Sequence, residues 1–329
     1  MADTSCFVTG GSGFIGGRLI ERLVADGRPV RALARSDSSA AKVEALGAEA
    51  VRGDLEDRAS LAAGAAGCAT AFHLAAHLGE WGAWEEFERG NVEGTRNALA
   101  ACRDAGVRRF VHCGTEAALM AGEPLVHVDE TAPLRPDSRA PYPATKARAE
   151  LAVREANRDG FETVVVRPRF VWGRGDTTLL PELVKMVEAG RFAWVGGGRN
   201  VTDTAHVDNV VEGLLLAAEK GRPGEAYFVT DGEPVVFREF ITELMATAGV
   251  EMPDRSVPVA VAKPLAAASE GIWGALRRTS APPLTRLAVW LSAMECTIDI
   301  SKARAELGYE PVVSREAGIA DLRASPPLE

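Results

Sequence analysis

The stretch CFVTGGSGFIGG, residues 6–17, decides the fold. It opens with a short apolar, β-prone run, passes through a glycine-rich turn and continues into residues 18–24, a helical pattern with Leu19, Ile20 and Leu23 on one face. A strand, a glycine turn and a helix in this order suit a dinucleotide pyrophosphate, because glycines permit the close approach of phosphates and the helix N-terminus attracts anions. We therefore predict a nucleotide site here, and the alternative is a tight turn with a purely structural role.

Short apolar segments alternate with amphipathic helical segments along the first half of the chain. This alternation predicts an α/β protein with a doubly wound parallel sheet of the Rossmann type, because parallel strands need helical crossovers on both faces. The predicted strands are residues 4–9, 29–34, 48–52, 69–74, 107–113 and 162–168, with helical segments such as 91–105 and 143–158 between them.

Beyond Pro168 the pattern loosens into glycine-rich and proline-interrupted segments, apart from a helical pattern at 205–219 and a strand pattern at 226–229. The chain is long enough for one large domain or two interlocked domains. We predict a nucleotide-binding domain of residues 1–170 plus 205–235, and a smaller, mostly helical C-terminal lobe of residues 171–204 plus 236–329 that covers the substrate.

Tyr142 and Lys146 lie about one helical turn apart, in a segment where Pro143 and the following Lys-Ala-Arg-Ala-Glu run favour a helix. A free tyrosine has a pKa near ~10, and a neighbouring positive charge favours its phenolate form. The pair is therefore a candidate acid/base device, in which we expect Lys146 to lower the pKa of Tyr142. The alternative is an ordinary exposed tyrosine and lysine on a helix.

The glycines at positions 10, 13 and 16, together with Tyr142 and Lys146, resemble the extended short-chain dehydrogenase/reductase family. Within that family the nearest resemblance is to the 3β-hydroxysteroid dehydrogenase-like branch, and it continues through most of the chain. Its further landmarks are Gly53-Asp54-Leu55, Phe72-His73-Leu74-Ala75-Ala76-His77, Asn91-Val92-Glu93-Gly94-Thr95, Arg167-Pro168, Trp172-Gly173 and His206-Val207-Asp208-Asn209-Val210.

The same resemblance implies the catalytic residues. Thr115 takes the place of the family's last serine or threonine on this strand, although Gly114 departs from the usual run of hydroxyl residues. Its hydroxyl is expected to donate to the substrate oxygen beside Tyr142, and the alternative is a strand-end or turn hydroxyl. Thr115, Tyr142 and Lys146 then imply hydride transfer between a nicotinamide and a secondary alcohol or ketone. Tyr142 moves the proton, and Lys146 also bonds the nicotinamide ribose.

The end of the second strand bears on the choice of cofactor. An acidic residue there binds the ribose 2′-hydroxyl of NAD, but Ala34 stands at that position, followed by Arg35 and Ser36. A guanidinium suits a 2′-phosphate, so we favour NADP(H) over NAD(H). The alternative is that Arg35 stacks on adenine or faces solvent while Asp37 binds NAD. The predicted cofactor-binding residues are Gly10, Gly13, Phe14, Ile15, Gly16, Arg35, Asp54, Leu55, Leu74, Ala75, Ala76, Tyr142, Lys146 and Pro168.

Nucleotide-sugar epimerases and dehydratases share the family's core. In these enzymes an arginine usually stands four residues before the histidine of the His-Val-Asp segment and grips a diphosphate, but here that position is Thr202. Dehydratases also resemble one another in an acid-base pair after the threonine, whereas Ala117 follows Glu116 here. We interpret Glu116 as a strand-end surface charge, and the alternative is a catalytic acid. Substitute cations remain available in Arg169, Arg174, Arg191 and Arg199. We expect simple alcohol–ketone redox, with a nucleotide-sugar epimerase and a non-catalytic cofactor-binding sensor as the alternatives.

Aromatic residues are spread over the predicted lobe and the loops near the cofactor, which suits a hydrophobic, ring-shaped substrate. The family resemblance implies that a steroid-like molecule is one candidate. We expect Trp81, Trp84 and Trp172 to bind this substrate together with Thr115, although core packing is open to most of the aromatic side chains. Residues 258–295 are mildly amphipathic, and we expect a packed lid there, with contact to a membrane surface as the alternative.

Composition excludes other classes of protein. The chain has 37 Lys and Arg against 46 Asp and Glu, so no nucleic-acid partner is expected. Its five cysteines lack C-x-x-C spacing, which is typical of reduced thiols in a cytoplasm. His73 and His77 have a metal-ligand spacing but fall at a strand end and a turn, so no metal site is predicted. Residues 1–4 show no signal-peptide pattern, and no apolar run reaches the ~20 residues of a membrane span. We expect a cytoplasmic enzyme with a small-molecule partner, and a homodimer is left open.

Overall fold

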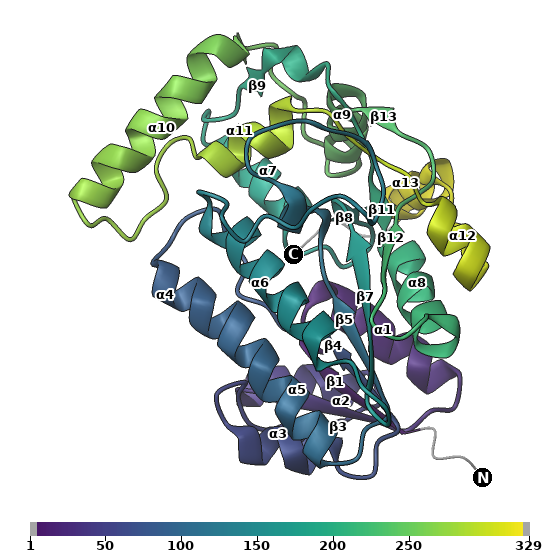
Figure 1. The fold of residues 1–329 in the computed structure, drawn as a ribbon. Helices are drawn as coiled ribbons and strands as arrows, with labels where there is room; N and C mark the ends of the chain where they lie inside the picture. Colours follow the sequence, from purple (N-terminus) through teal and green to yellow (C-terminus); the bar gives the residue numbers. More distant parts are fainter. Residues whose placement is uncertain (1–4, 325–329) are drawn as a thin grey trace.

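A seven-stranded parallel sheet forms the centre of the protein (Figure 1). The computed structural model describes residues 5–324. The strand order is β12-β7-β5-β4-β1-β2-β3, with every neighbouring pair parallel. The strands are β1 (Cys6–Thr9), β2 (Val30–Ala34), β3 (Glu49–Arg52), β4 (Thr70–His73), β5 (Arg109–Cys113), β7 (Glu162–Pro168) and β12 (Ala226–Val229).

These strands confirm the predicted doubly wound fold. The six strands expected in the first half match to within two residues at either end, and β12 is the predicted returning strand. Residues 1–4, which include the predicted start of the first strand and the region without a signal-peptide pattern, lie outside the described residues. The chain adds strands on one side of β1 up to β3 and then on the other side from β4 onward, so a crevice is expected at the carboxyl ends of β1 and β4.

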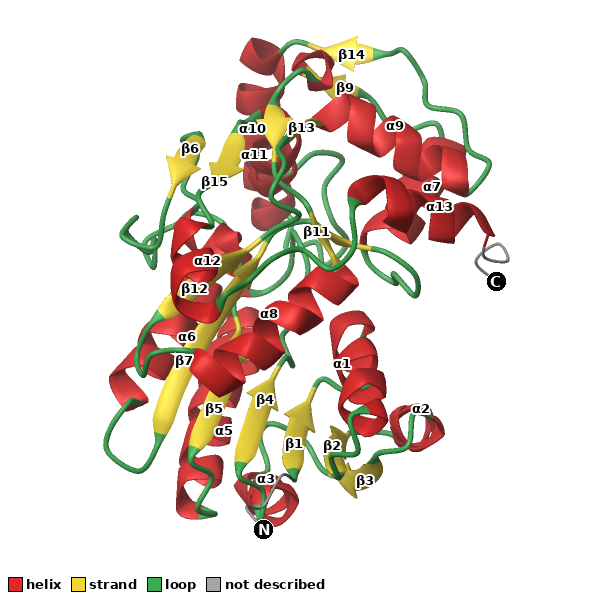
Figure 2. Cartoon of the chain, turned by 90° about the vertical axis from the view of Figure 1, so that its right-hand side faces the viewer, coloured by secondary structure: helices red, strands yellow, loops and turns green. Residues whose placement is uncertain are grey.

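Helices cover both faces of the sheet (Figure 2). On one face α1 (Phe14–Ala25) contacts α8 (Val207–Lys220), and on the other α3 (Arg58–Ala65), α5 (Gly94–Asp104) and α6 (Pro141–Ala156) pack together. Helix α2 (Asp37–Ala45) packs beside β2 and β3. In β1, Cys6 and Val8 pack in the core beneath α1 and α8, whereas Phe7 packs in the core beneath α3 and α5. Burial on both faces explains why these strands are continuous apolar runs rather than alternating ones.

A smaller, mostly helical lobe lies beyond the carboxyl ends of the strands, as predicted. Its sheet runs β13-β10-β15-β6. Strand β6, which the sequence did not predict, comes from within residues 1–170 and pairs with β15 across the predicted domain boundary. The strands of the lobe are β6 (Leu125–Val128), β8 (Val171–Trp172), β9 (Trp194–Val195), β10 (Val201–Thr202), β11 (Ala205–His206), β13 (Val235–Val236), β14 (Ser256–Val257) and β15 (Cys296–Ile298).

The helices of the lobe come mainly from the C-terminal third. They are α7 (Leu179–Glu188), α9 (Phe237–Thr247), α10 (Val259–Ala275), α11 (Arg286–Ala293) and α13 (Arg315–Ala324), while α12 (Ser301–Leu307) returns to pack on α8 and β12. Helix α10 extends outward at the upper left of Figure 1. It leaves Val261, Leu265, Ile272 and Leu276 more than half exposed. The remaining short elements are α4 (Trp84–Phe87), the π-helix η1 (Glu88–Glu93) and the 3₁₀ turns η2 (Glu116–Leu119) and η3 (Gly196–Gly198).

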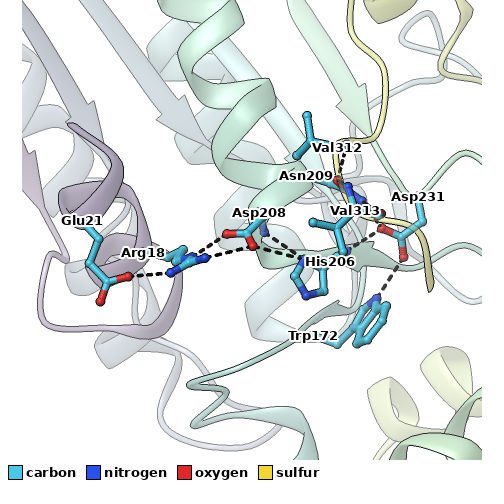
Figure 3. Close-up of polar contacts among 9 residues, drawn as sticks. All are labelled: Arg18, Glu21, Trp172, His206, Asp208, Asn209, Asp231, Val312 and Val313. Atoms are coloured by element: carbon cyan, nitrogen blue, oxygen red, sulfur yellow. Dashed lines mark hydrogen bonds and ion pairs between the residues drawn. The ribbon is translucent and has the colours of Figure 1, made fainter. Parts of the chain in front are cut away.

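A buried polar joint connects the main sheet to the lobe (Figure 3). The Asp231 carboxylate, just beyond β12, accepts hydrogen bonds from the Trp172 indole at 2.9 Å and the Thr204 hydroxyl at 2.6 Å. It also accepts from the His206 backbone N–H at 2.6 Å and the Asn209 amide at 2.8 Å. One carboxylate therefore holds β8, β11 and the start of α8 together.

The same segment reaches outward in two directions (Figure 3). The Asn209 side-chain oxygen accepts the backbone N–H groups of residues 312 and 313, at 2.7 and 2.9 Å. Arg18 of α1 donates to Asp208 at 2.5 and 3.1 Å, which attaches α1 to α8. His206 Nδ1 accepts the Asp208 N–H at 3.2 Å and caps α8. Burial lowers the pKa of His206, which fits its structural role as the cap of α8.

Candidate active site

A cleft of about 1160 Å³ opens at the carboxyl ends of the strands, between the sheet and the lobe. All fourteen residues predicted to bind the cofactor line it, and so does Thr115. They come from the ends of six strands and from α1 and α6, which shows how residues distant in sequence meet at one edge of a parallel sheet. Their roles in binding stay predictions.

In the glycine turn between β1 and α1, neighbouring backbone atoms leave no room for a side chain at Gly10 or Gly16. Gly10 has a φ of 76°, and a Cβ there would lie 2.6 Å from the backbone nitrogen of Ala75. A Cβ on Gly16 would lie 2.1 Å from the carbonyl oxygen of Gly10. Helix α1 begins at Phe14 without a side-chain cap from Gly13, so its first N–H groups remain available to an anion. These features fit the pyrophosphate of a dinucleotide.

Basic and hydroxyl side chains from the segment that follows β2 line one part of the cleft. Arg35 is 84% exposed at its side chain, and its Nε lies 4.0 Å from Asp54 Oδ2. Ser36 and Ser39 cap α2 reciprocally, so both are fixed at the cleft wall. Lys42, which the sequence analysis missed, also lines the cleft, whereas Asp37 does not. Asp37 instead pairs with Arg52 at 3.3 Å on the exposed surface.

Helix α6 positions Tyr142 and Lys146. It begins at Pro141, where a proline costs no hydrogen bond, and it confirms the helix predicted for 143–158. Lys146 is buried, and its Nζ donates to the Cys113 carbonyl at the end of β5, at 3.0 Å. Burial lowers the pKa of Lys146, against the opposing influence of Cys113 and Glu150. The ammonium is therefore anchored on the sheet rather than free on the helix surface.

The pKa of Tyr142 departs from our expectation. It is raised above its ordinary value, first by burial and then by the negative charge of Glu116 and by Cys113, while the Thr115 hydroxyl acts in the opposite direction. The prediction that Lys146 lowers this pKa is wrong, because burial and the charge of Glu116 raise it, and the Lys146 ammonium donates to the Cys113 carbonyl. The phenol is thus kept protonated, which suits it to donate a proton.

Glu116 is a second correction. We predicted a surface charge, but Glu116 is 3% exposed and lines the cleft. Its Oε1 accepts from Arg169 Nη1 at 2.6 Å, and its Oε2 accepts the Thr115 hydroxyl at 2.8 Å. Arg169, one of the cations considered for a sugar-nucleotide diphosphate, is therefore already paired. The hydrogen that we expected Thr115 to donate to substrate goes to Glu116.

The strand ends below the cofactor region are fixed by buried polar contacts. His73 is enclosed between the hydroxyls of Thr9 at 2.7 Å and Thr95 at 3.0 Å, and burial lowers its pKa to about 3. Asn91, within the π-helix η1, bonds Thr145 at 3.0 Å and the backbone of His77. No group of side chains suited to hold a metal occurs within residues 5–324.

The predicted tryptophans do not line the cleft. Trp172 is fully buried against Phe240 and His206, so we correct its assignment to the substrate. The Trp81 indole donates to the Arg278 carbonyl at 3.1 Å, and Trp84 is an exposed residue next to Arg148. Apolar residues that the sequence analysis missed line the cleft instead, namely Leu78, Phe170, Val171, Leu179, Leu287 and Leu291. Their one sequence signal is the i, i+4 spacing of Leu287 and Leu291 on α11.

The fold and the site together define a class. A seven-stranded sheet with a glycine turn at its switch point, and a Thr-Tyr-Lys set in the same cleft, is the arrangement of an extended short-chain dehydrogenase/reductase.

Comparisons with known proteins agree. The chain matches the model of the 3-beta hydroxysteroid dehydrogenase/isomerase family over residues 7–259. It is 50% identical over 321 residues to a 4-hydroxy-2-methyl-3-oxo-4-farnesyl-3,4-dihydroquinoline-1-oxide ketoreductase of Stigmatella aurantiaca, covering 98% of this chain and 96% of that one. It is 38% identical over 329 residues to a 2-alkyl-3-oxoalkanoate reductase of Stenotrophomonas maltophilia, covering 97% and 98%. A dTDP-glucose 4,6-dehydratase of Streptomyces venezuelae, solved with NAD bound, superimposes with a TM-score of 0.75 at 26% identity, covering 97% and 95%.

The chain belongs to the 3-beta hydroxysteroid dehydrogenase/isomerase family. It is an NAD(P)-dependent oxidoreductase of the extended short-chain type, and it uses a nicotinamide cofactor. Among residues 5–324, no helix combines the length and the apolar character needed to cross a membrane.

Proposed function

We propose that the protein transfers a hydride between NADP(H) and a secondary alcohol or ketone of a hydrophobic substrate, with a steroid-like ring system as one candidate. The observation that carries this proposal is that Thr115, Tyr142 and Lys146 line the same cleft as the glycine turn at residues 10–16. The two relatives described above are named as reductases of ketone substrates, which supports the same reaction.

The residues divide the chemistry between them. A bound nicotinamide supplies or accepts the hydride, so that the substrate carbon is reduced or oxidised by two electrons. In ketone reduction Tyr142 donates its proton to the carbonyl oxygen, and in alcohol oxidation the phenolate takes that proton back. Lys146 lies one turn from Tyr142, and its Nζ donates to the Cys113 carbonyl at the end of β5. In this proposal the same ammonium also bonds the nicotinamide ribose. Thr115 keeps a lone pair with which it can accept from the product hydroxyl or from Tyr142.

The preference for NADP(H) rests on the cations at the end of β2. Arg35 and Lys42, together with the hydroxyls of Ser36, Ser38 and Ser39, line this part of the cleft, and Asp37 is outside it. Two cations suit a 2′-phosphate better than a ribose hydroxyl. NAD(H) remains the alternative cofactor.

An apolar wall supports the choice of a hydrophobic substrate. Leu78, Phe170 and Leu179 line the cleft, joined by two leucines of α11 from the lobe. No cation of the kind that grips a diphosphate stands at Thr202, and Arg169 is neutralised by Glu116. A nucleotide-sugar epimerase is therefore the weaker candidate, and a non-catalytic sensor is the other.

Turnover of a substrate panel tests this function. We expect the protein to oxidise NADPH with ethyl 2-methylacetoacetate or a 3-oxosteroid, and to leave UDP-glucose and dTDP-glucose unchanged. Tyr142→Phe should lower kcat by about 10²–10⁴-fold, because only the acid/base oxygen is lost, while NADPH binding measured by fluorescence stays the same. Isomerisation of a sugar nucleotide without net NADPH oxidation would identify an epimerase. NADPH binding without turnover of any substrate would favour the sensor.

A further inference from the structure

Glu116, which accepts the Thr115 hydroxyl, forms a buried ion pair with Arg169. The proposed mechanism gives this ion pair no role. Both side chains are almost fully buried. A buried ion pair contributes little net stability, because desolvation of the two charges offsets their attraction. We therefore look for a role of this ion pair in the active site rather than in stability.

Arg169 is held from several directions. Its Nε donates to Thr202 at 2.8 Å, its Nη1 donates to Glu116 at 2.6 Å, and its guanidinium lies 4.3 Å from the ring centre of Phe170. Phe170 itself lines the cleft. Because the guanidinium is fixed, the Glu116 carboxylate that it binds is fixed as well.

The second oxygen of Glu116 determines what Thr115 can do. The Thr115 hydroxyl has one hydrogen and two lone pairs. Its hydrogen goes to Glu116 at 2.8 Å, and one lone pair accepts the Ala117 N–H at 3.2 Å. One lone pair is left toward the cleft, so Thr115 is an acceptor there and the donor to a ketone oxygen must be another group.

We propose that Glu116, clamped by Arg169, is a positioning residue that fixes the Thr115 hydroxyl as an acceptor, leaves Tyr142 to donate to the substrate carbonyl, and so sets the site for ketone reduction. This inference rests on the proposed function. The charge of Glu116 acts in the same sense, because it raises the pKa of Tyr142 and keeps the phenol protonated.

The groups around the phenol define the expected pH dependence. Burial, Glu116 and Cys113 disfavour the phenolate, and the Thr115 hydroxyl favours it. Lys146 is on the same helix as Tyr142, and Arg169 is paired with Glu116. Reduction needs the protonated phenol, so its rate is present below the pKa of Tyr142 and is lost as the pH rises through it. Removing the negative charge of Glu116 should move this loss to lower pH.

Two variants separate charge from geometry. Glu116→Gln keeps an acceptor for Thr115 but removes the charge, so we expect the titration of Tyr142 to fall by about one pH unit or more. The double variant Glu116→Met/Arg169→Met removes the acceptor without leaving an unpaired buried charge. We expect it to lower kcat about tenfold at neutral pH with NADPH affinity unchanged, comparable to the loss of one hydrogen bond.

Glu306→Gln is a matched control. Glu306 also accepts a hydroxyl, from Tyr227 at 2.7 Å, and pairs with an arginine, Arg222, at 3.0 Å, but it does not line the cleft. It should leave the kinetics of reduction and the titration of Tyr142 unchanged.

The measurements are the pH profile of kcat for NADPH-dependent reduction of ethyl 2-methylacetoacetate, and the ultraviolet absorbance of tyrosine phenolate. The chain has three tyrosines, so the difference between each protein and its Tyr142→Phe counterpart isolates Tyr142. An unchanged Tyr142 titration in Glu116→Gln, or an equal shift in Glu306→Gln, overturns the proposal. Failure of the parent protein to reduce any ketone overturns the proposed function instead, and the phenolate titration still tests the influence of Glu116.

Discussion

Single residues acquire their chemistry in this site from neighbours that are distant in sequence. Tyr142 is a protonated phenol because burial and Glu116 oppose its ionisation, and Lys146 is anchored by the carbonyl of Cys113. Thr115 faces the cleft with a lone pair because its hydrogen is given to Glu116. The catalytic residues that we predicted line the cleft. The rise of the Tyr142 pKa and the donation of the Thr115 hydrogen to Glu116 follow from contacts that the spacing of residues in the sequence does not reveal.

Arg35 offers the sharpest prediction at this scale. Arg35→Ala should weaken NADPH binding by about 10–100-fold, because a hydrogen bond to a charged group contributes about 1.5–3 kcal/mol. NADH, which lacks the 2′-phosphate, should bind with unchanged affinity. Calorimetric titration with both nucleotides measures this difference. Arg52→Ala is the control, since Arg52 is a neighbouring exposed arginine that pairs with Asp37 and does not line the cleft. An NADPH preference that survives Arg35→Ala contradicts the assignment.

At the scale of elements, the site depends on how helices are attached to the strand ends. Helix α1 carries the glycine turn and is tied to α8 by Arg18 and Asp208, while α8 is tied to the lobe through Asp231 and Asn209 (Figure 3). The sequence placed α1 and α8 correctly from their apolar periodicity. It did not reveal this joint, because the polar partners are separated by up to 190 residues.

Asp231→Ala should destabilise the protein by roughly 3 kcal/mol or more. The substitution leaves four donors buried without an acceptor, and each unsatisfied buried group costs about 1–3 kcal/mol. Urea unfolding followed by tryptophan fluorescence measures the loss. The matched substitution Asp254→Ala removes a carboxylate that is 96% exposed and paired with Arg238, and we expect no measurable change there. If Asp231→Ala and Asp254→Ala changed the free energy of unfolding equally, the hydrogen bonds of Asp231 would make no specific contribution to stability.

At the scale of the whole molecule, one hydrophobic cluster joins the sheet to part of the C-terminal third, while the lobe also has a cluster of its own around Trp172, Trp194 and Phe240. The cluster that contains Val8 and Leu19 of the first strand and helix also contains Trp290, Ile298 and Leu307 from the C-terminal third. Helix α12 packs on α8 and β12, and β6 pairs with β15. The predicted division into a nucleotide-binding domain and a lobe stays a prediction, and the shared cluster shows only that the two parts are in contact.

The cluster that joins the sheet to the C-terminal third predicts that these parts unfold cooperatively. Leu307→Ala should cost about 2–5 kcal/mol, because it removes a fully buried side chain. The loss should lower the temperature of a single transition rather than melt the lobe first. Calorimetry gives the number of transitions, and near-ultraviolet circular dichroism at the same temperatures checks it. Val312→Ala, at a side chain that is 54% exposed, should have little effect. A separate early transition in Leu307→Ala would show that the lobe unfolds on its own.

The sequence by itself determined the order of strands and helices, the glycine turn and the membership of Thr115, Tyr142 and Lys146 in one site. Periodicity and turn chemistry are local, and parallel topology brings strand ends together. Strand β6 and the two-residue strands of the lobe escaped prediction, because short strands carry too few residues for a periodic signal.

The tertiary structure alone decided which side chains face the cleft and what state they hold. Trp172 is in the core, whereas Leu291 is partly exposed and lines the cleft, although both are apolar residues of the lobe. Glu116 is a buried partner of Arg169 instead of a surface charge, and burial followed by the charge of Glu116 raises the pKa of Tyr142. Burial and electrostatic environment depend on contacts between segments far apart in the chain, so they follow from packing and not from local pattern.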